Sequence, residues 1–165
     1  VAVCRAVQKV YGTQLFVKWV NDLYNAEYKK CGGILTQAAV DLEGGGLEYA
    51  IVGVGLNVAP PPQGFPQELT AIAGAILQEP RPQHMSELTA CLADEISGMT
   101  EWLSDAEWLE EYRTRNFLLG KEIWIERGGQ RTPAKAQRIL DDARLLVKTP
   151  QGEETLNFEE VSVRL

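Results

Sequence analysis

Apolar residues first recur at helical spacing and then at the spacing of strands. In VAVCRAVQKVYG (1–12) they recur about every three positions, which predicts a helix that ends at Gly12. The next segment, QLFVKWV (14–20), has the β-branched and aromatic composition of a buried strand. We expect a loop from Asn21 to about Lys30 after that strand.

Two longer apolar runs follow and have the pattern of a hairpin. CGGILTQAAVDL (31–42) and LEYAIVGVGLNV (47–58) are separated by the glycines at 44–46, which favour a turn. Because both runs are largely apolar, we expect them to lie in the centre of a sheet. The proline-rich segment APPPQGFP (59–66) ends the pairing, since proline has no amide donor.

Helical spacing then returns, and short alternating runs complete the chain. We expect helices in QELTAIAGAIL (67–77), HMSELTACLADEISGMTEWL (84–103) and SDAEWLEEYRTRN (104–116). Beyond residue 119, five short runs separated by turn residues predict a small five-stranded barrel. The fold class is therefore α+β, with residues 1–116 and 117–165 as two domains and a boundary near Asn116 to Gly120.

Composition excludes several classes of protein. A net charge of −7 argues against a broad surface for nucleic acid or anionic membrane, because such surfaces need excess Lys and Arg. The cysteine count, three at unrelated spacings, gives neither a disulfide framework nor a zinc pattern. No apolar run reaches the roughly 18 residues of a membrane span. We therefore expect a cytoplasmic protein with no membrane partner and no nucleic-acid partner for this chain, in which any anion site is local.

Polar residues and glycines interrupt the apolar runs at strand ends and inside predicted strands, where they could bind a ligand. Asn21-Asp22 and Lys29-Lys30 flank the polar segment between two apolar runs. Glycines inside predicted strands, Gly33 and the pair in GVG (53–55), suggest that another group approaches the backbone closely. Each feature also has a structural interpretation, namely solvated lysines, a turn and a β-bulge. Because these three features occur together, in this order and on adjacent strand ends, they favour a binding or catalytic site.

These motifs resemble those of the biotin protein ligases. KWVNDLYNAEYKKCGGIL (18–35) is similar to the family signature, Lys-Trp-(Pro or Val)-Asn-Asp followed by Lys-x-x-Gly-Ile-Leu, and VGVGLNV (52–58) to its Gly-x-Gly-x-Asn strand. The tail resembles the family's C-terminal SH3-like domain, with Glu159 where the family has Gly. The resemblance implies part of a class II synthetase-like mixed sheet with helices over residues 1–116, followed by an SH3-like β-barrel.

The resemblance also implies a reaction and a set of site residues. Biotin and ATP would form biotinyl-5′-AMP, and the biotinyl group would then pass to a lysine of a biotin carboxyl carrier protein. Lys30 would be catalytic and would bind biotin together with Gly33, Gly53 and Gly55. The expected ATP-binding residues are Lys18, Asn21, Asp22 and Asn57. Mg²⁺ would bind through the phosphates, with Asn21 and Asp22 as candidate ligands.

Two departures leave alternatives open. The family's Gly-Arg-Gly-Arg phosphate loop precedes the first motif and is not in this sequence, so the chain resembles the C-terminal half of a ligase. We expect such a chain to be inactive alone, and the open edges of strands 14–20 and 47–58 to make it dimerise or associate with the missing half. A lipoate ligase or octanoyltransferase, and a non-catalytic binding or assembly module, are the alternative functions. No helix-turn-helix is evident.

Overall fold

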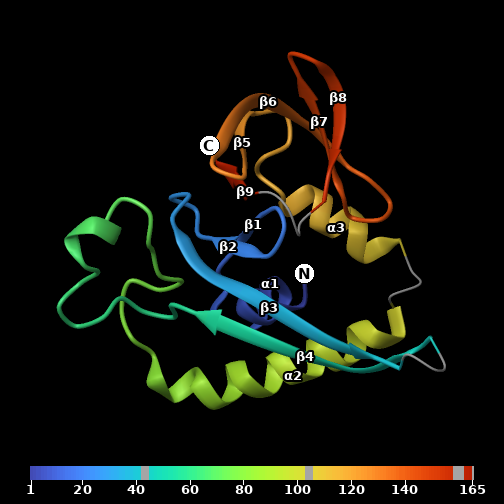
Figure 1. Cartoon of the computed structure of the whole chain (residues 1–165). Coiled ribbons are helices and arrows are strands. Elements are labelled where there is room, and N and C mark those ends of the chain that lie inside the picture. The colour runs from blue at the N-terminus through green and yellow to red at the C-terminus, as the bar shows by residue number, and fades with distance from the viewer. Residues whose placement is uncertain (42–44, 103–105, 158–161, 165) are drawn as a thin grey trace.

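The secondary structure is arranged around two sheets (Figure 1). The computed structural model describes residues 1–41, 45–102, 106–157 and 162–164. Helix α1 (Ala2–Tyr11) precedes the first sheet and ends at Gly12, whose φ of 69° lies in the left-handed region that favours glycine. The helix predicted at the start of the chain is therefore confirmed.

The first sheet has the strand order β1-β2-β3-β4, and each neighbouring pair is antiparallel. Its strands are β1 (Phe16–Lys18), β2 (Asp22–Tyr24), β3 (Lys30–Val40) and β4 (Leu47–Leu56). The hairpin predicted from the two apolar runs is confirmed as β3 and β4. Asp41 and Gly46 close its turn through a backbone hydrogen bond of 2.9 Å, while Gly44 lies outside the described residues.

Three expectations for this sheet are wrong in detail. The segment expected to be a loop contains β2, because Leu23 is 1% exposed and joins the core between β1 and β3. β4 is an edge strand of the described sheet rather than a central one, and most of its side chains are exposed. The sheet was expected to be mixed, but the parallel pairings given by the described residues are isolated bridges, Val17 with Asn116 and Lys30 with Ala73.

The helices after the proline-rich segment are confirmed in two cases out of three. α2 (Met85–Trp102), preceded by the 3-10 turn η2 (Pro82–His84), and α3 (Glu107–Arg115) lie where they were predicted. The helix predicted at 67–77 is wrong, since only the short turn η1 (Gln67–Leu69) forms. The chain after η1 runs beside the start of β3 instead. There the amide of Lys30 donates to the Ile72 carbonyl oxygen, and the amide of Gly74 to the Lys30 carbonyl oxygen, both at 2.8 Å.

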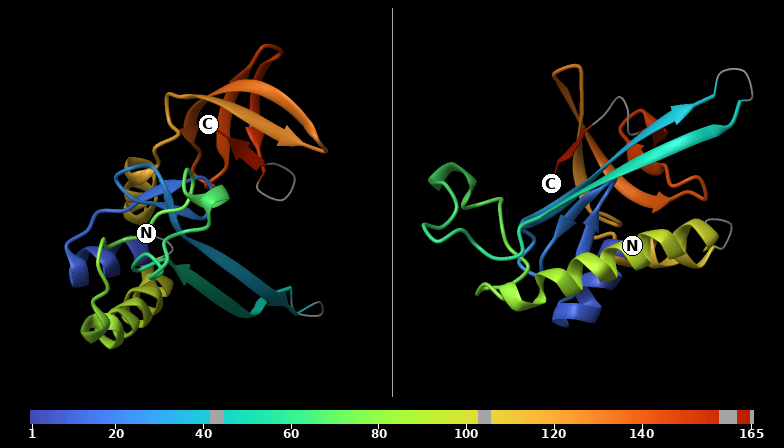
Figure 2. Two further views of the ribbon diagram at one scale, coloured as in Figure 1. Left: turned by 90° about the vertical axis from the view of Figure 1, so that its left-hand side faces the viewer. Right: turned by 90° about the horizontal axis from the view of Figure 1, so that it is seen from below.

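One core fills the space between the first sheet and the helices. Helices α1 and α2 lie together on one side of the β3–β4 hairpin (Figure 2). The buried members of this core are Val3, Cys4, Ala6, Val7, Leu15, Val17, Leu23, Cys31, Ile76, Leu77 and Leu88. Ile34, Val54 and Leu56 pack against it from the hairpin. The helices therefore cover one face of the hairpin.

The second sheet is antiparallel with the order β8-β7-β6-β5-β9. Its strands are β5 (Glu122–Arg127), β6 (Gln130–Ile139), β7 (Leu145–Thr149), β8 (Gly152–Leu156) and β9 (Ser162–Arg164). Five strands in the C-terminal segment are thus confirmed, and their closure into an SH3-like barrel stays a prediction. Glu159 lies outside the described residues.

A second core spans the expected domain boundary. Trp19, which is 5% exposed, packs in one cluster with Leu118, Ile123 and other residues of the C-terminal sheet, and its Nε1 donates to the Ala143 carbonyl oxygen at 2.9 Å. The bridge from Val17 to Asn116 covers the outer edge of β1, so the expectation of an open edge at strand 14–20 is wrong. The open edge is that of β4.

In the part of the chain that the structure describes, no helix combines the length and apolar character needed to cross a membrane.

Candidate functional site

The predicted residues Lys30 and Asp22 lie together on adjacent strands. Lys30 begins β3 and Asp22 begins β2, and the distance from Lys30 Nζ to Asp22 Oδ1 is 2.5 Å. The side chain of Lys30 is 47% exposed and that of Asp22 is 28% exposed. This ion pair therefore remains within reach of a ligand.

A tight loop fixes the backbone just before Lys30. Asn25 closes the loop of residues 25–29, because its Oδ1 accepts the amides of Glu27 at 3.0 Å and Lys29 at 3.1 Å. Its Nδ2 donates to the Ala75 carbonyl oxygen at 3.2 Å. The sequence analysis missed Asn25, although Asn is a common turn residue whose side chain bonds to nearby backbone.

Three of the predicted glycines form an open strip on the sheet face opposite the helices. Gly33 pairs with Gly55 across the hairpin, and Gly53 pairs with Leu35. A Cβ at Gly55 would meet no atom closer than 3.9 Å, and one at Gly53 none closer than 3.5 Å. We call Gly33, Gly53 and Gly55 the glycine floor. Packing of the chain itself does not require a glycine at Gly53 or Gly55, so their small size leaves room above the sheet for another group.

Gly32 differs from the floor glycines. A Cβ there would lie 2.6 Å from the Gly55 carbonyl oxygen and 2.7 Å from Leu56 Cδ2. Gly32 is therefore needed for the approach of β3 to β4. The sequence analysis did not separate it from Gly33, because the two glycines are adjacent and only their strand register distinguishes their faces.

Two hollows meet at the Lys30–Asp22 pair. The floor hollow, of about 480 Å³, is lined by Asn21, Asp22, Lys30, Gly33, Ile34, Leu35, Gly53, Val54 and Gly55. The loop hollow, of about 560 Å³, is lined by Asp22, Tyr24, Lys30, Gly32, Gly55, Asn57, Leu69, Ile72 and Ala73. Both volumes lie in the range of roughly 300–1,000 Å³ that small-molecule sites occupy. The sequence analysis missed Leu69, Ile72 and Ala73, because it placed them on a helix.

The remaining predicted residues differ in their relation to the hollows. Asn57 lines the loop hollow and donates from Nδ2 to the Gly74 carbonyl oxygen at 3.1 Å. Asn21 lines the floor hollow, and its Nδ2 donates to the Ile34 carbonyl oxygen. Lys18 pairs with Asp22 in the register of β1 and β2, but it is only 8% exposed and is not among the lining residues of either hollow. Its contact with ATP stays a prediction.

The carboxylate of Asp22 is shared by both hollows. Among the described residues, no group of three or more His, Cys, Asp and Glu side chains could hold a metal ion. A site with a single carboxylate is compatible with Mg²⁺ that is bound mainly by phosphates and water, because Mg²⁺ keeps several waters in such sites. The residues present thus fit the predicted mode of Mg²⁺ binding.

Cys31, the neighbour of Lys30, has no part in this site. Its side chain is fully buried, and the thiol donates to the Leu23 carbonyl oxygen at 3.5 Å. Burial raises the pKa of Cys31 to about 12. The thiolate is therefore scarce at neutral pH, and Cys31 acts as a packing residue.

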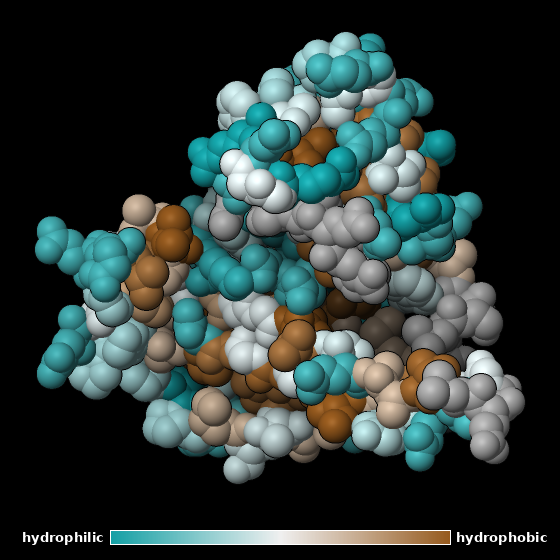
Figure 3. All heavy atoms as spheres, in the orientation of Figure 1, coloured by the Kyte–Doolittle hydropathy of each residue, from teal (hydrophilic) through white to brown (hydrophobic). Residues whose placement is uncertain are grey.

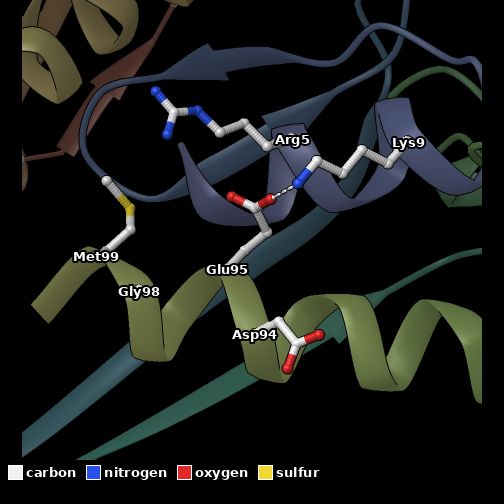
Figure 4. A pocket seen from close by; sticks show the side chains of 6 residues that line it. All are labelled: Arg5, Lys9, Asp94, Glu95, Gly98 and Met99. Atoms are coloured by element: carbon white, nitrogen blue, oxygen red, sulfur yellow. Dashed lines mark hydrogen bonds and ion pairs between the residues drawn. The ribbon is translucent and has the colours of Figure 1, made fainter.

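A separate hollow of about 260 Å³ lies between α1 and α2 (Figure 4). Its lining residues are Arg5, Lys9, Asp94, Glu95, Gly98 and Met99. Lys9 is paired with Glu95, and Arg5 contacts Glu111 at 2.7 Å. Because its cations already contact carboxylates of the chain, we assign this hollow no ligand.

The hairpin presents a large apolar surface as well as the glycine floor. Apolar side chains gather over β3 and β4 in the space-filling view (Figure 3). The exposed ones include Leu35, Val40, Leu47, Tyr49, Ile51 and Val52. Of these, Leu35, Tyr49 and Ile51 lie on the same face as the glycine floor, because side chains alternate along each strand, whereas Val52 lies on the opposite face. The apolar side chains beside the glycine floor suit a ligand with a flat apolar body.

Comparisons with known proteins relate this chain to the biotin/lipoate protein ligases. Residues 1–57 match the biotin/lipoate A/B protein ligase family. A 78-residue stretch is 37% identical to the bifunctional ligase/repressor BirA of Bacillus subtilis (strain 168), covering 47% of this chain and 23% of that protein. The bifunctional ligase/repressor BirA of Bacillus spizizenii is 36% identical over 78 residues, which again cover 47% of this chain and 23% of that protein. The match thus spans less than a quarter of the length of these curated relatives.

Solved structures agree on the fold. The apo biotin protein ligase of Aquifex aeolicus has a TM-score of 0.80 at 20% identity, covering 99% of this chain and 71% of that one. The same enzyme in complex with biotin and ATP gives a TM-score of 0.77 at 21% identity, covering 99% and 67%. These findings confirm the resemblance seen in the sequence: the chain is related to the biotin protein ligases, which are enzymes.

Proposed function

We propose that the protein ligates biotin to a lysine of a biotin carboxyl carrier protein through biotinyl-5′-AMP. One observation carries this proposal: the Lys30–Asp22 pair lies where the floor hollow and the loop hollow meet. A reaction between two anionic substrates needs positive charge at the point where they meet. Lys30 is the cation that lines both hollows.

The two hollows suit the two substrates in different ways. Biotin is a flat bicycle with an aliphatic tail, and it would lie over the glycine floor, where no side chain stands above Gly53 or Gly55. ATP would occupy the loop hollow, with adenine against the exposed side chains of Leu69 and Ile72 and with Asn57 near the ribose or phosphates. An amide side chain offers both a donor and an acceptor for such contacts.

In the first step, a carboxylate oxygen of biotin attacks the α-phosphorus of ATP and pyrophosphate leaves. Lys30 reduces the repulsion between the two anions and stabilises the charge that develops on the phosphate oxygens. Asp22, now paired with Lys30, holds the ammonium in place until the substrates bind. Asn21 and Asp22 would hold Mg²⁺, which neutralises phosphate charge when it is bound.

In the second step, the neutral amine of the acceptor lysine attacks the carbonyl carbon of biotinyl-5′-AMP. An amide bond forms, AMP leaves, and the nitrogen loses a proton. Lys30 remains beside the phosphate of the leaving AMP, so the same ammonium serves both steps. Asp22 lies at the same junction and is the carboxylate placed to accept that proton.

Radiolabelled pyrophosphate release from ATP, measured with and without biotin in the full-length protein, tests the proposal. We expect release that depends on biotin, followed by transfer of biotin to a carrier domain added to the assay. Absence of biotin-dependent release would contradict the proposal.

We further propose that this reaction takes place in the cytoplasm, where reduced thiols such as those of the three cysteines persist.

Lipoate is the second candidate substrate, because the matching family includes lipoate ligases. Calorimetric titration with biotin and with lipoate separates the two. The glycine floor favours biotin, whose rigid bicycle needs an area free of side chains, whereas the flexible chain of lipoate does not. Tighter binding of lipoate than of biotin would reverse the assignment.

A further inference from the structure

Aromatic and cationic contacts join the loop before Lys30 to the C-terminal sheet. The ring centroids of Tyr28 and Phe117 are 5.2 Å apart. Lys121 Nζ lies 4.6 Å from the centroid of Tyr28 and 5.2 Å from that of Phe117. A cation within about 6 Å of a ring is attracted by its negative face. We call Tyr28, Phe117 and Lys121 the Tyr28 clamp.

Tyr28 occupies an unusual place in the loop. Its φ of 56° lies in the left-handed region, which residues other than glycine seldom adopt. Its amide donates to the Asn25 carbonyl oxygen at 3.0 Å. The side chain is nevertheless 51% exposed, so core burial does not explain the conformation. In this conformation the ring of Tyr28 contacts Phe117 and Lys121, and its centroid also lies 5.9 Å from that of Phe16.

The other members of the clamp are firmly held. Phe117 is 8% exposed, and its amide donates to the Val17 carbonyl oxygen at 3.1 Å. Lys121 is joined to the C-terminal sheet by a backbone bond of 3.0 Å from the Ala136 amide to its carbonyl oxygen. The clamp therefore connects a fixed body, the C-terminal sheet, to the loop that ends at Lys30.

We infer that Tyr28 and Lys121 are positioning residues that let the C-terminal sheet hold Lys30 at the junction of the two hollows. The inference rests on the proposed function for its chemical meaning. Neither residue lines the floor hollow or the loop hollow, so neither touches the substrates there. Loss of the clamp changes kcat for adenylation more than it changes KM for biotin, because the glycine floor belongs to the β3–β4 hairpin and not to the loop.

Steady-state pyrophosphate release by the full-length protein tests the positioning role. Tyr28→Ala and Lys121→Met remove the contact, whereas Tyr28→Phe keeps the ring and Lys121→Arg keeps a cation on it. We expect the first pair to lower kcat by about threefold to tenfold, as expected for the loss of a weak contact, and the second pair to match wild type. Lys148→Met is the matched control, because it removes an exposed positive charge on β7, outside the clamp.

Limited proteolysis provides a readout that does not need catalysis. Trypsin cleaves after lysine, and the Lys29–Lys30 bond lies in the clamped loop. We expect Tyr28→Ala and Lys121→Met to speed cleavage at this bond severalfold without lowering the melting temperature, and Lys148→Met to leave the rate unchanged. If the wild-type protein shows no adenylation, the proposed function fails, and the cleavage rates still decide whether the clamp holds the loop.

Three results would overturn the inference. Equal cleavage of wild type, Tyr28→Ala and Lys121→Met would show that the contact does not hold the loop. Faster cleavage with unchanged kcat would show that the clamp exists but does not position Lys30. The inference would also be contradicted if Tyr28→Phe and Lys121→Arg lowered kcat as much as Tyr28→Ala and Lys121→Met do. The contact between the ring and the cation would then not explain the effect.

Discussion

At the scale of single residues, the Lys30–Asp22 pair is poorly suited to stabilising the fold. Its two side chains are 47% and 28% exposed, and ion pairs at such exposure typically contribute about 0–1 kcal/mol. Two backbone hydrogen bonds, with Ile72 and Gly74, also hold Lys30 without the use of its side chain. The charged side chain is therefore available for chemistry at little cost in stability.

We expect Lys30→Ala to lower adenylation by ~10²- to 10³-fold, the usual loss when one charge-stabilising donor is removed. The free energy of unfolding should change by less than ~1 kcal/mol. Pyrophosphate release and urea denaturation of the full-length protein measure the two effects. Lys29→Ala is the matched control, because Lys29 lies outside both hollows and pairs with Glu27 at 4.0 Å. Release within about threefold of wild type for Lys30→Ala would refute the catalytic assignment.

Cys31 gives the molecule a predictable response to alkaline pH. Its folded-state pKa of about 12 exceeds the ordinary thiol value of 9.0 because burial disfavours the thiolate. Between about pH 9 and pH 12 the unfolded state loses this proton while the folded state keeps it, so stability falls as pH rises. The free energy of unfolding should drop by up to ~1.4 kcal/mol per pH unit from this group.

Urea denaturation at several pH values, on wild type and Cys31→Ala, isolates that contribution. Cys4 is also buried and its pKa is raised, so Cys31→Ala should reduce the alkaline slope without abolishing it. Identical slopes in the two proteins would mean that Cys31 is accessible to solvent in the folded state.

At the scale of elements, the sequence predicted those segments whose local pattern agrees with their tertiary role. α1, α2 and the β3–β4 hairpin have long periodic patterns and clear end signals, such as Gly12 after α1. β2 is only three residues long and begins within the polar pair Asn21-Asp22, so its pattern is too short to be recognised. Segment 67–77 has helical spacing, but its backbone bonds to β3 through Lys30, a partner far away in the sequence.

The candidate site was predictable to a similar extent. The glycine floor lies on strands that were correctly assigned, whereas Lys30 and Asp22 lie in the segment expected to be a loop and were singled out by their resemblance to the family motif. The roles of these residues stay predictions. Asn25 and Tyr28 were not singled out, since their roles depend on contacts with Ala75 and Phe117 that no local pattern encodes. The burial of Lys18 was missed for the same reason, because a lysine in a predicted strand gives no sign of which neighbours cover it.

The glycines of the β3–β4 hairpin should separate binding from folding. Gly55→Val should weaken biotin binding by more than ~10-fold, equivalent to ~1.4 kcal/mol, because the new side chain fills open space above the sheet. Gly32→Ala should instead destabilise the fold, since its Cβ would lie 2.6 Å from a backbone oxygen. Calorimetric titration with biotin and thermal melting measure the two outcomes. Unchanged affinity in Gly55→Val would exclude the glycine floor as the biotin site.

The open edge of β4 predicts self-association of this chain. Leu47, Tyr49 and Ile51 on this strand are each more than half exposed, and unpaired strand edges next to apolar surface readily pair with another copy. Ile51→Lys should shift the mass measured by light scattering at micromolar concentration towards the monomer, because an edge lysine opposes such pairing. Glu48→Asp, which keeps the charge on the same strand and adds no lysine, is the control. A monodisperse wild-type monomer would contradict this prediction.

At the scale of the whole molecule, residues of both sheets meet in the second core, across the domain boundary that the sequence suggests. Trp19 comes from the segment that joins β1 to β2, yet it packs with Leu118 and Ile123 of the C-terminal part. Arg115 Nη1 adds a hydrogen bond to the Leu15 carbonyl oxygen at 3.2 Å. The boundary at residues 116 and 117 stays a prediction. Because residues on both sides of it pack in one cluster, we expect the chain to unfold in a single transition.

We expect the joint unfolding of the two sheets to depend most on Trp19. Trp19→Ala should lower the free energy of unfolding by ~3–5 kcal/mol, as large-to-small core substitutions of aromatic residues do. Trp19→Phe keeps most of the packing and loses the bond to the Ala143 carbonyl oxygen, so it should cost only ~1 kcal/mol. Urea denaturation, followed both by far-ultraviolet circular dichroism and by fluorescence of the remaining tryptophans, measures both changes. Since Trp19 lies in the shared core, the two signals should stay coincident in wild type and separate in Trp19→Ala. Separate transitions already in wild type would contradict this prediction and show that the two sheets unfold independently.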